Sequence, residues 1–279
     1  MKTYTLPEDL VTAEKTELMV YDYKAQKESN KQQVNLSLNT FSFLLEGNKE
    51  VFSNVESTAI SNAEFLLMRA GKCLMTEKFT GTNNSYRSIL FFFSNEAVFQ
   101  FSRKHAITLS KTSQRKAVQA IPFDHYLRSF VHSLIHLNAL STEAKHKVLQ
   151  VKFEELMLYL TGTIGSDFLE SLMTDINDYD FHFQEVVEHN KLNKLTLNEL
   201  AFLANMSLST FKRKFEGQFH TSPSKWFQER RLEYAAILLK NERKRPSDIY
   251  LEIGYDSLTN FIQAFKAKFG CTPKQYQLN

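Results

Sequence analysis

The sequence predicts an α+β protein with an N-terminal part of short strands and flanking helices, followed by an all-helical C-terminal part. Two observations support this fold class. Between residues 17 and 93, apolar side chains alternate with polar ones, which is the period of a strand, and turn residues separate the alternating stretches. In the last hundred residues, a segment occurs twice with phenylalanines at the three- and four-residue spacing of a helix. A chain of 279 residues is long enough for two cores.

The N-terminal part is expected to be an antiparallel barrel or sandwich, because many short strands are joined by turns. Its clearest alternation is Val34-Asn-Leu36-Ser-Leu38, and Glu-Gly-Asn-Lys at 46–49 predicts a hairpin turn. The other expected strands are 18–22, 41–45, 51–52, 65–68, 73–78 and 87–93.

After residue 93 the spacing of apolar residues changes to that of helices, which are expected from about 95 to 176. Gly162 and Gly165 are expected to end the longest of these helices. The expected helices are 96–103, 123–140, 143–160 and 167–174. The two long helices carry apolar stripes, formed by Tyr126, Leu127, Phe130, Leu134 and Leu137 and by Val148, Val151, Phe153, Leu156 and Leu160. A stripe does not name its partner, so packing on the strands and a homodimer interface both stay open.

Residues 177–180, Asn-Asp-Tyr-Asp, are the predicted linker between a first domain at 1–176 and a second at 181–279. Positive charge is concentrated in the second domain. It holds 15 basic and 10 acidic residues, against 19 and 21 in the rest of the chain. A modest basic excess by itself indicates only a solvated surface, so its meaning depends on the repeated segment in the same domain.

The repeated segment begins at Leu208 in the first copy and at Leu258 in the second, fifty positions later. The copies align a leucine, three phenylalanines, a hydroxyl residue followed by proline, and a final aromatic residue, which indicates an internal repeat. The stripes are Leu208, Phe211, Phe215 and Phe219 in one copy and Leu258, Phe261, Phe265 and Phe269 in the other. Each stripe lies on one helical face, so each helix buries that face and leaves the opposite one free.

A shorter helical pattern precedes each copy and ends in a sharp turn. Asn205 and Gly254 stand at these turns, and both residue types tolerate a positive φ. Each unit is therefore expected to be helix, tight turn, helix. In such a helix-turn-helix, the second helix enters the major groove of DNA.

The free faces of the two second helices supply the candidates for DNA contact. They are Ser209, Thr210, Lys212, Arg213 and Lys214 in the first unit and Thr259, Asn260, Ile262, Gln263 and Lys266 in the second. Arg213 is the leading candidate for a base contact, because its planar guanidinium can pair with guanine O6 and N7. Lys214 stands nearer the packed stripe and is expected to reach a phosphate, and further phosphate candidates are Lys225, Arg230 and Arg231.

The two units and the segment between them resemble the AraC/XylS family of transcription regulators. The resemblance is carried by Arg231, Ala235, Leu238-Leu239, Ile249, Gly254-Tyr255, Phe261, Phe265, Phe269-Gly270, Thr272-Pro273 and Tyr276. This chain departs from the family at Tyr250, where alanine is usual and the larger ring must be housed by local repacking, and at Arg245-Pro246, where an apolar residue is usual.

The resemblance implies a cupin-like barrel in the N-terminal domain and two recognition helices in adjacent major grooves of double-stranded DNA. It also implies a homodimer, contact with RNA polymerase as in an activator, and control by an effector of unknown identity. The resemblance does not decide whether that effector is a small molecule or a protein partner. The choice between activation and repression is open as well.

An enzyme is the alternative from another class, in the form of a cupin-type enzyme fused to a DNA-binding module. His132 and His136 have the spacing of two metal ligands, yet no glutamate of a metalloprotease pattern lies between them. No histidine occurs between residues 17 and 93, where a cupin enzyme would need several. We therefore predict no catalytic residue, no metal and no cofactor.

The cellular setting is expected to be the cytoplasm. Two cysteines far apart in sequence, Cys73 and Cys271, favour a reducing compartment over a disulfide framework. The longest apolar run, at 89–93, is too short to cross a bilayer, so no membrane partner is expected.

Overall fold

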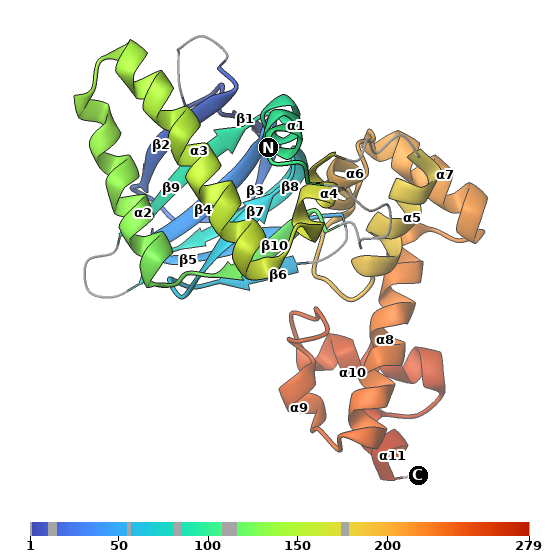
Figure 1. The fold of residues 1–279 in the computed structure, drawn as a ribbon. Helices are drawn as coiled ribbons and strands as arrows, with labels where there is room; N and C mark the ends of the chain where they lie inside the picture. The colour runs from blue at the N-terminus through green and yellow to red at the C-terminus, as the bar shows by residue number, and fades with distance from the viewer. Residues whose placement is uncertain are drawn as a thin grey trace. The chain divides into compact units, whose positions relative to one another are not determined.

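The computed structural model describes residues 2–10, 16–54, 57–80, 85–107, 116–173 and 179–278 (Figure 1). The chain divides into two compact units, Met1–Asp178 and Tyr179–Asn279. Of the linker predicted at 177–180, residues 177 and 178 lie outside the described residues, and Tyr179 and Asp180 begin helix α5 (Tyr179–His189).

The N-terminal unit contains two sheets, each of five strands among the described residues. One sheet has the order β1-β3-β8-β5-β6, with β1 (Tyr4–Leu6), β3 (Ser29–Leu36), β8 (Gly71–Lys78), β5 (Asn48–Phe52) and β6 (Ser57–Ile60). The other has the order β10-β7-β4-β9-β2, with β10 (Val118–Pro122), β7 (Glu64–Met68), β4 (Asn39–Glu46), β9 (Tyr86–Phe93) and β2 (Leu18–Ala25). The α+β class is confirmed, but the strands form two sheets rather than a closed barrel. Alternation predicts strands and not whether a sheet closes. The pairing is antiparallel except between β1 and β3, which run parallel.

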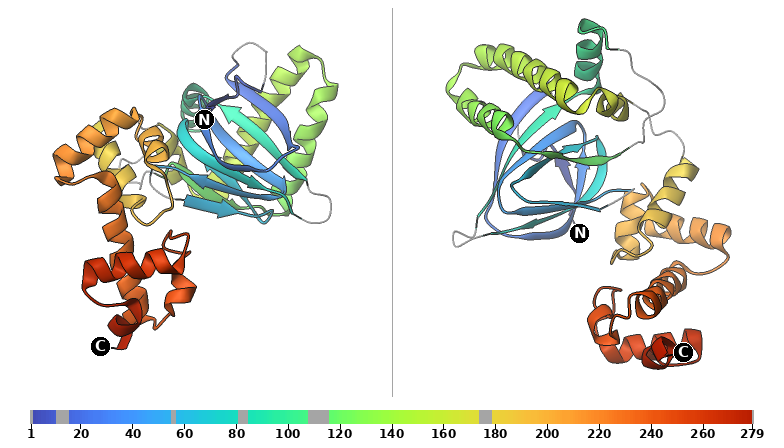
Figure 2. Two further views of the ribbon diagram at one scale, coloured as in Figure 1. Left: turned by 180° about the vertical axis from the view of Figure 1, so that it is seen from behind. Right: turned by 60° about the horizontal axis from the view of Figure 1, so that its bottom comes forward.

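The alternation along β4 explains why the N-terminal unit has three layers. Phe41 and Phe43 point to a core shared with the helices, whereas Leu44 belongs to the core between the sheets. Successive side chains of a strand point to opposite faces, so both faces of this sheet are buried. Figure 2 shows helices α2 (His125–Ile135) and α3 (Thr142–Ile164) lying across the outer face of this sheet.

The connection from β4 to β5 is shorter than the hairpin turn predicted at 46–49. Only Gly47 lies between the two strands, with φ at +99°. A Cβ atom there would lie 2.7 Å from both the Lys78 carbonyl oxygen and the Tyr86 ring, so glycine is required. Lys49, predicted to lie in the turn, instead lies in β5 with 3% of its surface exposed.

Four helices and one 3₁₀ turn complete the described part of this unit. Besides α2 and α3, they are α1 (Asn95–Lys104), the 3₁₀ turn η1 (His136–Ala139) and α4 (Asp167–Met173). The prediction that Gly162 ends the long helix was wrong, because it lies inside α3, which ends at Gly165 with φ at +84°. Two members of the predicted stripes also face outward, since Tyr126 is 43% exposed and Val151 is 65% exposed.

Candidate nucleic-acid interface

The C-terminal unit consists of helices among the described residues, and the repeat forms two of them with the same length. They are α5, α6 (Leu197–Leu203), α7 (Leu208–Phe219), α8 (Pro223–Asn241), α9 (Pro246–Ile249), α10 (Leu258–Phe269) and α11 (Pro273–Leu278). Both α7 and α10 have 12 residues. Each begins at a serine whose side chain accepts a hydrogen bond from a backbone N–H at 3.2 Å, Ser207 from Thr210 and Ser257 from Asn260. This is the capping that a helix start favours.

The two copies also pack alike, so the sequence repeat is a structural repeat. Phe215 meets Trp226 edge to face, with ring centroids 5.7 Å apart and an interplanar angle of 76°. At the equivalent positions Phe265 meets Tyr276 at 5.4 Å and 79°. Phe215 and Phe265 are fully buried, as the stripes predicted. Edge-to-face pairs of this kind stabilise by about 0.5–1.5 kcal/mol beyond their buried area.

The two turns have the backbone conformation that their residues predicted. Asn205 has φ at +58° and Gly254 has φ at +89°, and both predictions are confirmed. A Cβ atom at Gly254 would lie 3.7 Å from Arg231 Cδ, an ordinary contact distance, so it is the positive φ that makes a side chain unfavourable there. Tyr250 is housed as expected, half-buried against the core around Phe261 and Phe265.

Helix α8 connects the two helix-turn-helix units, and Figure 1 shows α7 near one end of it and α10 beside the other. Its first turns give Trp226 and Phe227 to the aromatic core of the first unit. Its later turns give Leu232, Leu238 and Leu239 to the core of the second. With 19 residues at about 1.5 Å of rise each, α8 is about 28 Å long.

The structure exposes most of the residues proposed from the sequence for DNA contact. Those with exposed side chains are Ser209, Lys212, Arg213, Lys225, Thr259, Asn260, Gln263 and Lys266, and those partly buried are Thr210, Lys214, Ile262, Arg230 and Arg231. Lys214 turns toward α5, since its Nζ lies 4.9 Å from the centroid of the Phe183 ring. A cation over an aromatic face is stabilised there, so part of the role of Lys214 is structural.

Arg230 and Arg231 have internal contacts. Arg230 Nη1 donates to Glu233 Oε2 at 2.8 Å, and its guanidinium lies 5.1 Å from the Trp226 ring centroid. Arg231 lies against Gly254, and burial lowers its pKa from the usual value. Both partners of Arg230 belong to α8 itself, whereas Arg231 packs against the turn at Gly254, and we expect substitutions at either position to act mainly on packing.

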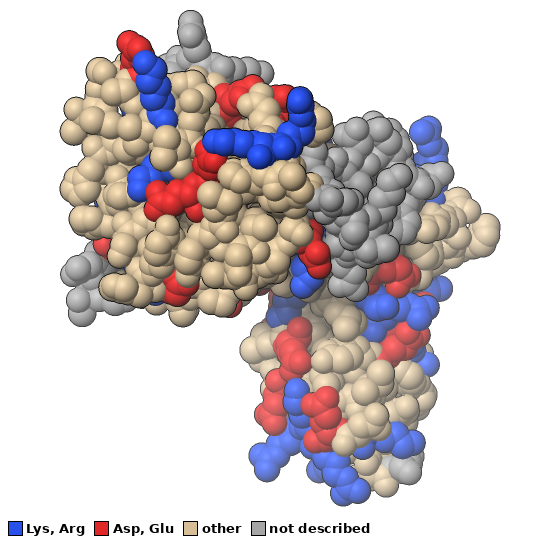
Figure 3. Space-filling model, viewed as in Figure 1, with Lys and Arg blue, Asp and Glu red and all other residues tan. Residues whose placement is uncertain are grey.

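The two basic side chains that lie freely on α7 are Lys212 and Arg213, one turn before the acidic Glu216. The hydroxyls of Ser209 and Thr210 are held at 3.0 and 2.8 Å from Ser207 Oγ, close to the start of the helix. Figure 3 shows basic and acidic side chains interspersed on the face of the C-terminal unit that it displays. On that face, basic side chains therefore occur in small groups and not as one continuous patch.

Residues of the N-terminal unit that the sequence did not single out form a buried polar group between the two sheets. Lys49 Nζ lies 3.6 Å from Glu77 Oε1, and Tyr23 donates to Glu77 Oε2 at 3.1 Å. The signal was present, because charged residues interrupt two apolar strands. It was missed because Lys49 was assigned to a turn.

The histidine pair considered as metal ligands lies on the helical layer, with the ring centroids of His132 and His136 4.9 Å apart. Across the part of the chain that the structure describes, no three histidine, cysteine, aspartate or glutamate residues gather as metal ligands would. Among the same residues, no helix has the length and apolar composition needed to cross a bilayer.

Two helix-turn-helix units sharing one connecting helix define a class of DNA-binding domain, here preceded by a sheet sandwich covered by helices. Residues 200–279 match the family model described as "Helix-turn-helix domain", and residues 39–172 match the model described as "ExsA N-terminal regulatory domain".

Curated relatives of the chain are named as transcriptional regulators. The chain is 37% identical over 130 residues to the virulence regulon transcriptional activator VirF of Yersinia enterocolitica, covering 46% of this chain and 48% of VirF. It is 32% identical over 126 residues to the HTH-type transcriptional regulator ExsA of Pseudomonas aeruginosa, covering 45% of each. The chain thus spans about half the length of the curated relatives it matches. A solved structure of apo ToxT from Vibrio cholerae aligns over 95% of this chain and 98% of ToxT, with 13% identity and a TM-score of 0.43.

These matches agree with the resemblance to the AraC/XylS family of transcription regulators that the repeated motif indicated.

Proposed function

We propose that the protein is a sequence-specific DNA-binding transcription regulator that places α7 and α10 in successive major grooves on one face of the duplex. The observation that carries this proposal is the position of two duplicated helices with exposed polar faces at the two ends of α8. Successive major grooves on one face of B-DNA lie about 34 Å apart, which is close to the length of about 28 Å of α8.

The exposed residues of α7 divide by chemistry into base and phosphate contacts. Arg213 is the residue proposed to read a guanine, because its side chain is exposed and no neighbouring carboxylate holds it in the described contacts. Lys212 is proposed to bind a phosphate from the adjacent exposed position. On α10, Asn260 and Gln263 can pair with adenine, and Lys266 supplies the one exposed cation of that helix.

The N-terminal unit is proposed to dimerise and to control the DNA-binding unit. On α3, Val151 and Leu158 lie two turns apart on one helical face and are 65% and 45% exposed. On the opposite face of α3, Phe153, Leu156 and Leu160 are buried in the core with the sheet, so the helix retains apolar surface after its own packing is complete. An exposed apolar face of this kind is typical of a protein interface.

The relatives named as transcriptional activators support a partner role for RNA polymerase, and we propose that the protein works in the cytoplasm. We also propose that it is not an enzyme. The polar residues between the sheets form an ion pair and hydrogen bonds, and the relatives matched here are regulators.

Binding to DNA selected from a random pool tests the proposal. Arg213→Ala should weaken binding to the selected site by about 1–3 kcal/mol and relax the preference at one base pair. Lys212→Ala, the matched variant one residue away, should weaken binding to every sequence and lower the salt slope by about one unit. Lys214→Ala should act mainly by loosening α7 from α5 and should lower the melting temperature. If Arg213→Ala bound the selected site with unchanged affinity, the proposed placement of α7 in the major groove would be wrong.

A further inference from the structure

The middle of α8 lies between the cores of the two helix-turn-helix units. Phe227 packs against Phe215 in the first core, and Leu232 belongs to the second core. Residues 228–231 connect these two positions. Most of the stability of a helix in a protein comes from its packing, so an unsupported stretch here would let one unit move against the other.

One side of this stretch packs against the turn of the second unit. A Cβ atom built at Gly254 would lie 3.7 Å from Arg231 Cδ and 3.8 Å from Arg231 Cζ, which are contact distances. Gln228 Nε2 donates a hydrogen bond to the hydroxyl of Tyr255 at 3.4 Å. Gln228 and Arg231 are three positions apart and therefore share one face of α8. Tyr255 extends the contact to α10, because its ring centroid lies 5.6 Å from that of Phe261.

The same turn also meets the first unit directly. Lys194 stands two residues before Thr196, the capping residue of α6, and α6 is the first helix of that unit. The Cγ atom of Lys194 would lie 3.4 Å from the Cβ position built at Gly254. Because Lys194 and Arg231 are both cations, the contact is made by their aliphatic stems, and their charged ends can stay in water. The two units therefore touch one another in addition to sharing α8.

The opposite side of the stretch is tied to α10. Glu233 Oε2 accepts a hydrogen bond from Arg230 Nη1 at 2.8 Å, and Glu233 Oε1 accepts one at 3.0 Å from Lys268 Nζ in the last turn of α10. Arg230 also lies over Trp226 of the first core, with its guanidinium 5.1 Å from the ring centroid. At about 100° per residue, Arg230 and Glu233 point to the side of α8 that faces away from the turn at Gly254.

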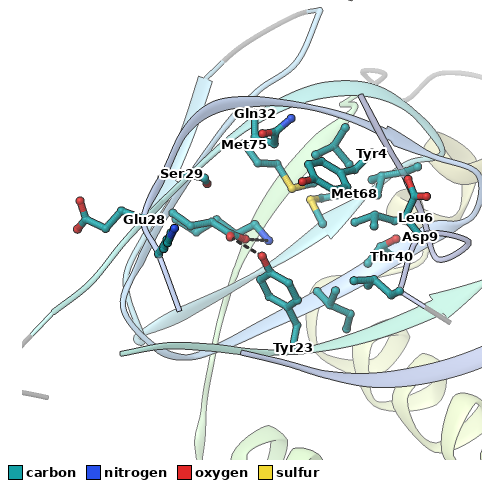
Figure 4. A pocket seen from close by; sticks show the side chains of 17 residues that line it. Tyr4, Leu6, Asp9, Tyr23, Glu28, Ser29, Gln32, Thr40, Met68 and Met75 are labelled. Atoms are coloured by element: carbon teal, nitrogen blue, oxygen red, sulfur yellow. Dashed lines mark hydrogen bonds and ion pairs between the residues drawn. The ribbon is translucent and has the colours of Figure 1, made fainter. Parts of the chain in front are cut away.

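These polar contacts act on geometry more than on stability. The side chains of Arg230 and Glu233 are 40% and 41% exposed, and ion pairs this exposed add little to the free energy of folding. A hydrogen bond is directional, so one made across two elements restricts how they lie. The N-terminal unit shows the same arrangement, since Tyr23 of β2 donates to Glu77 of β8 at 3.1 Å and so joins its two sheets (Figure 4).

We propose that these contacts form a junction that fixes the separation and the relative rotation of α7 and α10. The junction consists of Lys194, Gln228, Arg231 and Tyr255 on one side of α8 and of Arg230, Glu233 and Lys268 on the other. It determines DNA specificity without touching a base, because it sets the spacing between the two half-sites that α7 and α10 can read together. This inference rests on the proposed function, in which both helices enter the major groove.

Binding to duplexes that differ only in half-site spacing tests the junction. One inserted base pair moves the second half-site by about 3.4 Å and turns it by about 34°. The parent protein should bind the inserted duplex at least about tenfold more weakly than the selected site, as for the loss of a base contact. Arg231→Ala removes the stem that packs at Gly254 and should narrow this ratio to about threefold or less. Arg231→Met retains an apolar stem without the charge and should keep the ratio of the parent protein.

Lys212→Ala is the control, because it removes a cation of α7 outside the junction. It should bind both duplexes more weakly and in the ratio of the parent protein. A loss of folding stability likewise weakens binding to both duplexes alike, so a changed ratio reports on the junction. If Arg231→Ala does not fold, Lys194→Ala at an exposed position takes its place with the same expected ratio. A ratio near one in the parent protein, or an unchanged ratio in these two variants, would overturn the proposal.

A distance measurement without DNA separates this inference from the proposed function. Spin labels are placed at Gln218→Cys in α7 and Ala267→Cys in α10, both exposed, in the full chain with Cys271→Ser and with the buried Cys73 left in place. After dilution with unlabelled protein, pulsed electron spin resonance should give a narrow distance distribution, and Arg231→Ala should broaden it. Equal widths would refute the junction. A narrow distribution that broadens in Arg231→Ala, in a protein that binds no DNA, would keep the junction and reject the proposed function alone.

Discussion

Replacing Phe215 by alanine should destabilise the first helix-turn-helix unit more than the equivalent change, Phe265→Ala, destabilises the second. Both rings are fully buried, so each loss should cost about 3–5 kcal/mol for burial and the resulting cavity. Phe215 also contacts Phe183 at 6.3 Å and Phe227 at 5.8 Å, two ring contacts without a counterpart around Phe265 in the described residues. At about 0.5–1.5 kcal/mol each, these contacts predict an excess cost of about 1–3 kcal/mol for Phe215→Ala.

Native-state hydrogen exchange on the full chain can measure the difference, because it reports the free energy of opening for each helix separately. Amides of α7 in Phe215→Ala should lose more protection than amides of α10 in Phe265→Ala. The exposed Gln218→Ala, in the same helix, should change protection by less than about 0.5 kcal/mol. Equal losses in the two phenylalanine variants, or a loss below about 1 kcal/mol in Phe215→Ala, would refute the assignment of the extra aromatic contacts to stability.

Three further expectations concern folding, association and pH. The fragment 179–279 should fold alone and be helical by circular dichroism, whereas a strand spectrum would contradict the repeat. Val151→Glu should shift the protein from dimer to monomer in sedimentation, because it puts a charge on the exposed apolar face of α3, and a monomeric parent protein would disprove that interface. Asp22 accepts hydrogen bonds from Arg87 at 2.9 and 2.8 Å, which lower the pKa of the Asp22 carboxyl. The stabilisation is present above the ordinary aspartate pKa of about 3.9 and is lost as the pH falls, so urea melts of Asp22→Asn and the parent should converge in acid.

The sequence predicted the C-terminal unit well, because each helix there carries its own local signals. The spacing of the phenylalanines defined α7 and α10, and the positive φ at Asn205 and Gly254 followed from residue type. Exposure of Arg213 followed from the same helical period. The orientation of Lys214 could not be predicted, since it depends on Phe183 from another helix.

The N-terminal unit was predicted less fully, because its pairing is non-local. Strand β10 was missed: it is a short strand at the edge of its sheet, and it ends at Pro122 after pairing with β7, which lies about fifty residues earlier. The parallel pairing of β1 with β3 likewise could not be predicted, because neither strand carries a sequence pattern that identifies its partner. Burial of Lys49 depends on Glu77, its partner across the strands, which sequence spacing does not reveal.

Because α8 contributes side chains to the cores of both helix-turn-helix units, it limits which insertions and deletions the protein can accept in evolution. Each residue inserted into an α-helix turns everything beyond it by about 100° and advances it by about 1.5 Å. A single insertion between Phe227 and Leu232 would therefore turn α10 away from the side of the duplex that α7 is proposed to face. Exposed side chains such as Ser224 can be exchanged along this helix without that effect. Its length of 19 residues cannot change by even one without altering which base pairs the two units could contact together under the proposed binding.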